Sequence, residues 1–563
     1  MGEELAPATG RFLARAALLT AALSVGGAVL GLGRDQALAR LFGAGGATDA
    51  FLVAWTVPEF AATLLIEDGL ALALIPVFSL ALARRARGAP GDPVRALVAV
   101  TLPRLALAFA AVAALIVLIA PQLVAALAPG LSDPGLAVDC TRLTATCVLS
   151  FGLAGFCSAA LRAHRRFFAP AAIYIAYNTG IIASMVTLGG RWGVRAAAAG
   201  VAAGGFLMVS VQLPQLWRQL RRRAVPPGVV GDAGGTPMGV ALVAAVLLFA
   251  LCRQSQILVE RFLASSLPAG AISHLNYAQK VAQIPMTLSL MLCTVTYPLV
   301  ARAVADGDTE RARARVERDV ALAACVVLLG AATVVSCAPQ IIALLFQRGA
   351  FTARDTAATA GVMRVYALGL LAQTLVGALV RSYFSAGRPS WYPLGAMAAG
   401  IVVTAGAGGW AVGRWGVAGI AAANAAGITV TAVLLLHGMG PRSVPVRTRR
   451  VLTELGRALL AAVAATVAGA FAARHAATAA LPGLAAGVGA VAVVFVLAAR
   501  VLGVRGFAPA LRCVRPRARL PALLPARSLI RLLFRSRVRP FVRSRVRPFV
   551  RSVIGRLVHG RFR

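Results

Sequence analysis

The sequence predicts an all-α, polytopic membrane protein of about 14 transmembrane helices: two six-helix lobes related by an internal repeat, then two extra helices. Three observations lead to this class. Hydrophobic residues make up 59% of the chain and charged residues only 13%, whereas soluble proteins carry about 25% charged residues. Apolar runs long enough to cross about 30 Å of hydrocarbon as a helix recur along the chain. Finally, two halves of the chain share short motifs in the same order.

The apolar runs, taken in order, give fourteen expected spans. They are 13–42, 48–83, 96–127, 139–161, 167–189, 193–217, 237–265, 270–301, 318–346, 356–386, 390–413, 416–438, 452–474 and 480–503. Arginines cluster in alternate loops, at 84–95, 162–166, 218–223, 302–318 and 442–457. The intervening loops are poorer in arginine. The positive-inside rule therefore places the arginine-rich loops and both termini in the cytoplasm.

An internal repeat divides these spans. PQLVAALAPG at 121–130 matches PQIIALLFQRG at 339–349, and ALRAHRRFFAP at 160–170 occupies the place of VRSYFSAGRPSWYP at 380–393. The offset is about 220 residues in both cases. We therefore expect four parts: an N-terminal lobe (1–223), a second lobe (237–440), helices 13 and 14 (450–503), and an Arg-rich cytoplasmic tail (504–563). Transporters built from two such repeats bind substrate between the lobes, near the midplane.

Ionisable residues inside the expected spans are the main functional signal, because a charge at the bilayer centre costs about 2.5–3.5 kcal/mol. The first span carries Arg34 and Asp35, and the second is acidic. Its acids are Asp49, Glu59, Glu67 and Asp68. A structural explanation is also open for Arg34 and Asp35, as caps of a helix end, and for Asp49, as an N-terminal charge.

The seventh and eighth spans hold the remaining cluster. Glu260 and Arg261 lie on 237–265, close enough to a loop to snorkel instead. Lys280, the only lysine among 57 basic residues, lies about ten residues into 270–301, roughly 15 Å deep. Asn276, Lys280 and Gln283 fall on one helix face. We expect a charged cavity lined by spans 1, 2, 7 and 8.

The last sixty residues are different. Residues 504–563 contain 17 arginines and no acid, and RSRVRPFV occurs twice in tandem, at 535–542 and 543–550. This composition is typical of a segment held on anionic cytoplasmic lipid. A basic tail without a role is the alternative. The tail is tethered to a membrane and has no recognisable fold, so nucleic acid is not an expected partner.

Enzymatic chemistry is not expected. The sequence shows no Gly-rich phosphate loop, no nucleophile elbow and no zinc-ligand spacing, and its eight cysteines are scattered, so no catalytic residue, metal or disulfide framework is predicted. Nothing indicates a cofactor or ATP. Energy for transport would then come from the membrane potential, worth about 2.3 kcal/mol per charge per 100 mV, or from an ion gradient.

Several motifs resemble the MurJ/MviN family of lipid II flippases, in the superfamily of multidrug and oligosaccharidyl-lipid exporters. They are GLGRDQALARLFGAGGATDAF (31–51), LIEDGLALALIPVF (65–78), LAPGLSD (127–133), NYAQKVAQIP (276–285) and LLFQRGAFTARDT (344–356). The resemblance covers about 10–505 and implies a two-lobed protein of fourteen helices in the bacterial cytoplasmic membrane. It also implies that undecaprenyl-diphosphate-linked disaccharide-pentapeptide moves from the inner to the outer leaflet by alternating access, for cell-wall synthesis.

The resemblance implies a cationic cavity for the diphosphate and a groove at helices 13 and 14 for the lipid tail. Lys280 occupies the place of a cavity arginine. We predict the substrate-binding set Arg34, Asp35, Asp49, Glu260, Arg261, Asn276 and Lys280. Glu59 and Glu67, with Asp49, are the candidates for ion coupling.

Four positions depart from the family pattern. Ala28 and Ala62 stand where cavity arginines are typical, Gln283 stands at a usually acidic position, and Glu59 adds an acid. Two other functions therefore stay open. One is export of another polyprenyl-linked oligosaccharide or a small molecule. The other is a non-transporting membrane scaffold that recruits envelope-synthesis proteins through its basic tail.

Overall fold

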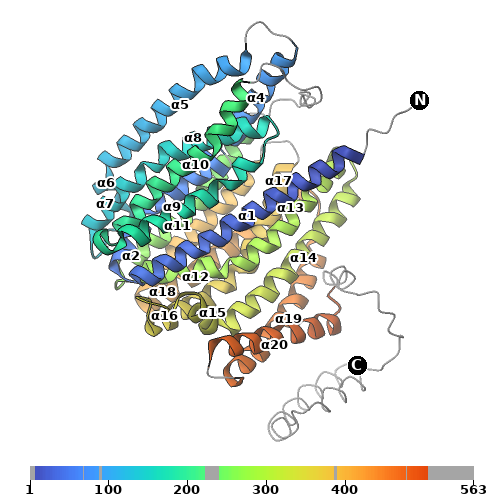
Figure 1. Cartoon of the computed structure of the whole chain (residues 1–563). Coiled ribbons are helices and arrows are strands. Elements are labelled where there is room, and N and C mark those ends of the chain that lie inside the picture. Colours follow the sequence, from blue (N-terminus) through green and yellow to red (C-terminus); the bar gives the residue numbers. More distant parts are fainter. Residues whose placement is uncertain are drawn as a thin grey trace, which may run out of the picture. The chain divides into compact units, whose positions relative to one another are not determined.

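The computed structural model describes residues 7–67, 69–87, 92–221, 240–385, 390–476 and 479–504 (Figure 1). Every regular element in these ranges is a helix, which confirms the all-α class. Asp68 and nearly all of the basic tail fall outside them, so the predictions for these residues stay predictions.

Ten α-helices and one π-helical segment form the first half of the described chain. They are α1 (Pro7–Phe42), α2 (Gly46–Ala54), α3 (Thr56–Ala61), η1 (Ala62–Glu67), α4 (Gly69–Ala86), α5 (Pro93–Leu118), α6 (Ala120–Leu127), α7 (Pro134–Ala145), α8 (Cys147–Ala163), α9 (Phe168–Trp192) and α10 (Arg195–Arg221). The starts of α5 and α7 follow from local chemistry: Asp92 and Asp133 accept hydrogen bonds from the first backbone N–H groups, and a proline follows each.

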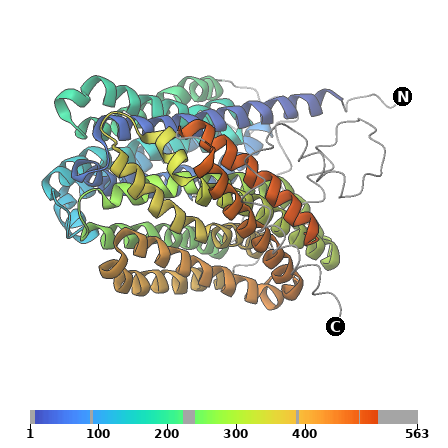
Figure 2. The ribbon, with the colours of Figure 1, turned by 90° about the horizontal axis from the view of Figure 1, so that it is seen from below.

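The second half contains eight α-helices and a 3₁₀ turn, followed by two C-terminal helices. They are α11 (Val240–Ser265), α12 (Ala271–Ala282), α13 (Ile284–Ala305), α14 (Thr309–Ser336), α15 (Ala338–Phe346), α16 (Ala353–Tyr366), η2 (Ala367–Gly369), α17 (Leu370–Ser385), α18 (Tyr392–Arg442), α19 (Thr448–His475) and α20 (Ala480–Val501). The last two lie side by side in both views and pack on α14 and α15 (Figures 1 and 2).

The order of helices repeats between the halves. A long helix, a short one beginning Ala-Pro-Gln, and two consecutive helices follow one another as α5 to α8 and again as α14 to α17. The motifs at 121–130 and 339–349 both form the short helix of this series. The boundaries of the two expected lobes stay a prediction, and the repeated order supports them.

Two expected spans are broken where the functional signal is strongest. The run 48–83 breaks at Trp55, because Pro58 has no N–H for the carbonyl of Ala54. The hydroxyl of Thr144 donates to that carbonyl instead, at 3.2 Å. The run 270–301 breaks at Gln283, just before Pro285. A broken span within a bundle frees backbone groups and redirects side chains.

Helix α18 contains two spans, not one. Gly416 has φ 54° and ψ −133°, values that interrupt the helix and favour glycine. The chain then folds back: Tyr392 Oη donates to the Leu434 carbonyl at 2.7 Å, and Thr431 Oγ1 donates to the Ala396 carbonyl at 3.3 Å. The predicted spans 390–413 and 416–438 are the two arms of this hairpin.

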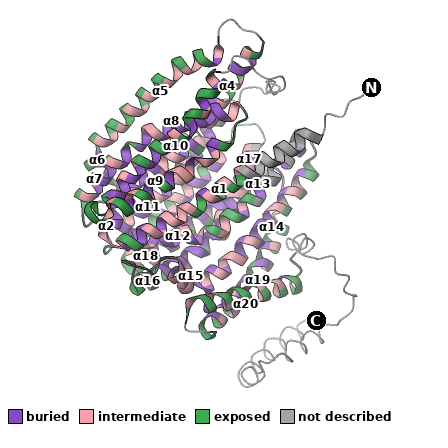
Figure 3. Cartoon of the chain, viewed as in Figure 1, coloured by how far each residue is buried: buried purple, intermediate pink, exposed green. Residues whose placement is uncertain are grey.

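The described chain holds 10 helical segments long and apolar enough to cross a membrane, α18 counting once. Helices α1, α11 and α12–α13 are not among them, so the total of fourteen stays a prediction. The outward face of α5 is apolar and exposed, as is typical of a helix surface that contacts lipid. Its most apolar stretch has no buried residue, and Leu107 and Leu118 are 73% and 74% exposed. Buried positions gather between the helices (Figure 3).

One end of the bundle is held shut by loops from both halves. We call residues 43–46, 128–132, 265–270 and 348–351 the closed end. The Ala350 N–H donates to the Arg40 carbonyl at 2.9 Å, and the Gly130 N–H donates to Ser265 Oγ at 3.3 Å. Gly43, at φ +68°, lies so close to Ala350 that a Cβ would be 2.7 Å from its carbonyl oxygen. The two halves therefore meet backbone against backbone here.

Candidate functional site

Arg34, Asp35 and Lys280 form one ion cluster around a buried carboxylate, with the side chains of Arg34 and Lys280 13% and 27% exposed. The Arg34 guanidinium donates to Asp35 Oδ1 at 2.8 and 3.0 Å, and the Lys280 ammonium lies 3.3 Å from the same oxygen. Asp35 is 5% exposed. Arg34 and Asp35 come from α1 and Lys280 comes from the last turn of α12, so the cluster joins the two halves of the chain.

The aromatic ring of Trp55 packs against both cations of this cluster. Its ring centroid lies 4.4 Å from Arg34 Cζ and 5.6 Å from Lys280 Nζ. Cation–π attraction of this kind is worth about 2 kcal/mol or more when desolvated. Trp55 can reach both cations because it occupies the break between α2 and α3.

Asn178, on α9, fixes Arg34 from the other side. Its Oδ1 accepts from Arg34 Nη1 at 3.2 Å, while its Nδ2 donates to the carbonyls of Gly27 and Tyr174 at 3.1 and 2.9 Å. These bonds orient the amide and hence the guanidinium. The cluster thus presents two oriented cations that share one carboxylate, and an incoming phosphate could take the place of that carboxylate.

A second ion pair joins the halves beside the first. Arg261 Nη2 donates to Glu59 Oε2 at 2.7 Å, and its Nη1 donates to Thr56 Oγ1. The Arg261 side chain is 5% exposed and that of Glu59 is 23% exposed. Arg261 does not snorkel; it is buried against helix α3.

Glu260 points away from this pair. Its carboxylate accepts a hydrogen bond from the amide of Asn424, on the second arm of α18, and both residues are buried. The adjacent residues Glu260 and Arg261 therefore have separate partners, one within the second half of the chain and one in the first half.

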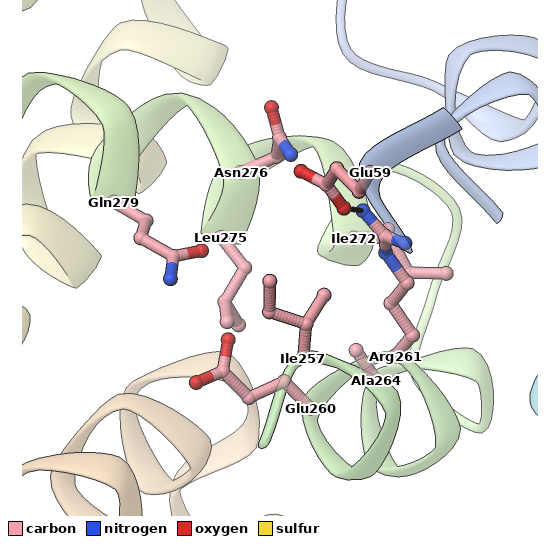
Figure 4. Close-up of a pocket in the computed structure, with 9 residues that line it drawn as sticks. All are labelled: Glu59, Ile257, Glu260, Arg261, Ala264, Ile272, Leu275, Asn276 and Gln279. Atoms are coloured by element: carbon pink, nitrogen blue, oxygen red, sulfur yellow. Dashed lines mark hydrogen bonds and ion pairs between the residues drawn. The ribbon is translucent and has the colours of Figure 1, made fainter. Parts of the chain in front are cut away.

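Figure 4 shows a small pocket between these groups. Its volume is about 20 Å³, room for roughly one water and far too little for a phosphate. The lining residues are Glu59, Ile257, Glu260, Arg261, Ala264, Ile272, Leu275, Asn276 and Gln279. In this conformation the pocket therefore cannot hold a phosphate.

The structure brings together six of the predicted residues in this region: Arg34, Asp35, Glu59, Glu260, Arg261 and Lys280. Asn276 joins them as part of the pocket wall and is 9% exposed. Among the departures from the family pattern, Ala28 is exposed and Ala62 begins η1. Gln283 donates to Tyr366 Oη at 3.3 Å.

Asp49 and Glu67 lie elsewhere. The Asp49 carboxylate, on α2, accepts from the N–H groups of Gly270 and Ser273 at 2.6 and 2.7 Å and from the Ser273 hydroxyl at 2.5 Å. It thus caps the start of α12 from the other half of the chain. Glu67 is exposed and accepts from Tyr174 Oη at 3.1 Å. Their roles in substrate binding and ion coupling stay predictions.

Four residues of the site escaped sequence reasoning: Trp55, Thr56, Asn178 and Asn424. Trp55 carried a usable signal. The other five tryptophans lie toward the ends of long helices, where aromatic belts form, and each is about half exposed. Trp55 lies inside a span. Thr56 and the two asparagines had no distinguishing pattern.

Comparisons with known proteins identify the family. Residues 38–484 match the family model described as lipid II flippase MurJ. A lipid II flippase MurJ from Burkholderia cenocepacia is 28% identical over 383 residues, covering 66% of this chain and 73% of that protein. A probable lipid II flippase MurJ from Haemophilus influenzae is 25% identical over 459 residues, covering 77% and 88%.

Solved structures support the fold. A lipid II flippase MurJ in an inward closed conformation superposes with a TM-score of 0.69 at 17% identity, covering 88% of this chain and all of that one. An inward-facing multidrug transporter of the MATE family gives 0.60 at 13% identity, covering 77% of this chain. The family model spans most of the chain, and the chain therefore belongs to the MurJ family of lipid II flippases.

Proposed function

We propose that this protein moves lipid II, an undecaprenyl-diphosphate-linked peptidoglycan precursor, from the inner to the outer leaflet of the bacterial cytoplasmic membrane. One observation carries the proposal: Arg34 and Lys280, from opposite halves of the chain, converge on one buried carboxylate above Trp55. Family membership supplies the substrate.

The mechanism follows from how the two cations are held. In the closed state, Asp35 pairs with both Arg34 and Lys280 and so ties α1 to α12, and the three groups keep one net positive charge. A diphosphate entering between the halves would take over these donors, because phosphate oxygens accept charge-assisted hydrogen bonds as carboxylates do. Asp35 then no longer holds Lys280, and the halves are free to rock apart at the closed end. The replacement of Asp35 by the diphosphate thus couples substrate binding to the movement of the two halves.

The direction of transport requires the topology inferred from the arginine-rich loops. Both termini then lie in the cytoplasm, and the closed end faces outward. The membrane potential or an ion gradient drives the cycle, with Glu59 and Glu67 as the ion-coupling candidates. The tail at 504–563, which could bind anionic lipid or envelope-synthesis proteins, lies outside the described residues apart from Val504.

Transport of lipid II in cells depleted of their own flippase tests the proposal. Wild type and Lys280→Arg should restore outward lipid II, whereas Lys280→Ala should not. Arg195→Ala, which removes an arginine that is 47% exposed, is the control and should behave as wild type. If the inserted wild-type protein fails to move lipid II, the proposal is wrong, and polyprenyl-linked oligosaccharides of other composition become the substrates to assay.

A further inference from the structure

The two ion pairs that join the halves share one plan. In each, a helix of the first half supplies the acid and a helix of the second half supplies the base. Asp35 on α1 holds Lys280 on α12, and Glu59 on α3 holds Arg261 on α11. The first pair belongs to the site described above. For the second pair, the sequence places Arg261 among the substrate-binding residues and Glu59 among the ion-coupling candidates, but it gives neither residue a specific part in recognising the substrate.

The two pairs lie around one dipeptide. The ring of Trp55 lies under Arg34 and Lys280, and the hydroxyl of the next residue, Thr56, accepts from Arg261. Neighbouring Cα atoms are only about 3.8 Å apart, so both ion pairs contact adjacent residues at the α2–α3 break. Glu59 is also close enough to act electrostatically on Arg34 and Lys280.

Glu59 differs from Arg261 in how easily it can leave. Arg261 is 5% exposed and is held between Thr56 and the pocket wall, whereas Glu59 is 23% exposed (Figure 4). Glu59 is thus the more exposed partner of the pair, and it lies at the edge of the pocket. Once the pocket widens enough to admit an anion, that anion meets the Arg261 guanidinium, and its present partner Glu59 can turn toward solvent.

We propose that Arg261 is a specificity-determining residue that binds the second phosphate of a prenyl diphosphate, and that Glu59 is its internal competitor. The inference rests on the proposed function. Arg34 and Lys280 suffice for one phosphate group. Arg261 offers a planar fork of donors for the other, which a monophosphate lacks. The protein therefore selects diphosphates over monophosphates through this residue.

Equilibrium binding to the purified full-length protein in detergent tests this, with undecaprenyl diphosphate and undecaprenyl phosphate as the two probes. Wild type should prefer the diphosphate. The double variant Glu59→Gln/Arg261→Gln leaves no unpaired charge and should lose about tenfold or more of its diphosphate affinity while monophosphate affinity stays within about threefold. Glu59→Gln alone frees Arg261 and should tighten diphosphate binding. Arg253→Gln, an exposed arginine on the same helix, is the control.

Three outcomes overturn the inference. If the double variant loses affinity for both lipids equally, the Glu59–Arg261 pair only supports the fold of the site. Weaker diphosphate binding by Glu59→Gln shows that Glu59 is not a competitor. If wild type binds neither lipid, the proposed function fails and the inference fails with it. Because Glu59→Gln keeps Arg261, it decides the matter even where the double variant does not fold.

Discussion

The ammonium of Lys280 lies 3.3 Å from Oδ1 of Asp35, a residue 245 positions earlier in the chain. This contact joins two helices, α1 and α12, that are far apart in the sequence. Arg34 donates to the same oxygen. This ion pair links the two halves of the chain. It also shows where a phosphate, which carries more negative charge than the carboxylate, would bind.

The Asp35–Lys280 pair should contribute measurably to stability. In a double-mutant cycle of Asp35→Asn and Lys280→Gln, we expect a coupling of about 1–3 kcal/mol, because the Asp35 carboxylate is buried and the Lys280 side chain is only 27% exposed. The free energy of unfolding in detergent measures it. The exposed pair Asp139–Arg195, with N and O atoms 2.7 Å apart, is a matched control and should give less than about 1 kcal/mol. Equal couplings would contradict the prediction.

Gly43→Ala should loosen the closed end. The new Cβ would lie 2.7 Å from the Ala350 carbonyl oxygen, and φ +68° is unfavourable for alanine. A cysteine placed at Ala264, 2% exposed on the pocket wall, should then react faster with a water-soluble maleimide. Gly45→Ala, where a Cβ meets nothing within 4 Å, should leave the rate unchanged. Equal rates in both variants would show that the closed end opens without this contact.

Asp49→Ala should destabilise the protein through α12. The substitution leaves the N–H groups of Gly270 and Ser273 without their charged acceptor, a loss of about 2–3 kcal/mol. Asp49→Asn keeps an acceptor and should lose less. Asp133→Ala, which removes an exposed cap of α7, should cost about 1 kcal/mol. Thermal unfolding of the purified variants ranks the three, and a larger loss for Asp133→Ala would refute the assignment.

His164 should make stability depend on pH. Burial lowers the pKa of His164 below its ordinary 6.5, and the nearby Arg85 and Arg166 charges act in the same direction. The His164 imidazole therefore takes up a proton near pH 6.5 in the unfolded chain and only at a lower pH in the folded protein. The stability that this difference contributes is present above pH 6.5 and falls as pH drops below it.

His164→Gln should reduce that fall in melting temperature between pH 7.5 and pH 5.5, because glutamine can still donate to the Ala160 carbonyl but does not titrate. His437→Gln, at an exposed histidine, is the control for losing an imidazole. An unchanged pH dependence in His164→Gln would rule out the assignment.

The helices and the charge cluster could be predicted because both depend on local or additive signals. Apolar length sets the spans, and the cost of a buried charge marks Arg34, Glu260, Arg261 and Lys280 wherever their helices pack. The break at Gln283 was also readable, since Pro285 lies just beyond it.

The side chains that pair with one another could not be predicted, because pairing depends on how each helix is rotated and shifted along its axis relative to its neighbours. Glu260 and Arg261 are adjacent in sequence yet bind Asn424 and Glu59, and nothing in their spacing says so. The sequence predicts that Asp49 binds substrate, with an N-terminal charge on its own helix as the alternative. It does lie in the first turn of α2, but nothing in the sequence indicates that its carboxylate also caps α12. The amide of Asn178 gained its role only through the approach of α9 to α1.

The Asp49 cap has a consequence for how the protein is made. Asp49 is synthesised 221 residues before Gly270, and Glu59 is synthesised 202 residues before Arg261. At ordinary rates of translation the ribosome needs roughly 10 to 40 s to supply the partner of Asp49. For that time the nascent first half holds Asp49 and Glu59 without the groups that later donate hydrogen bonds to them. The first half acquires these hydrogen bonds only after the second half has been synthesised. The two halves therefore fold together as one unit.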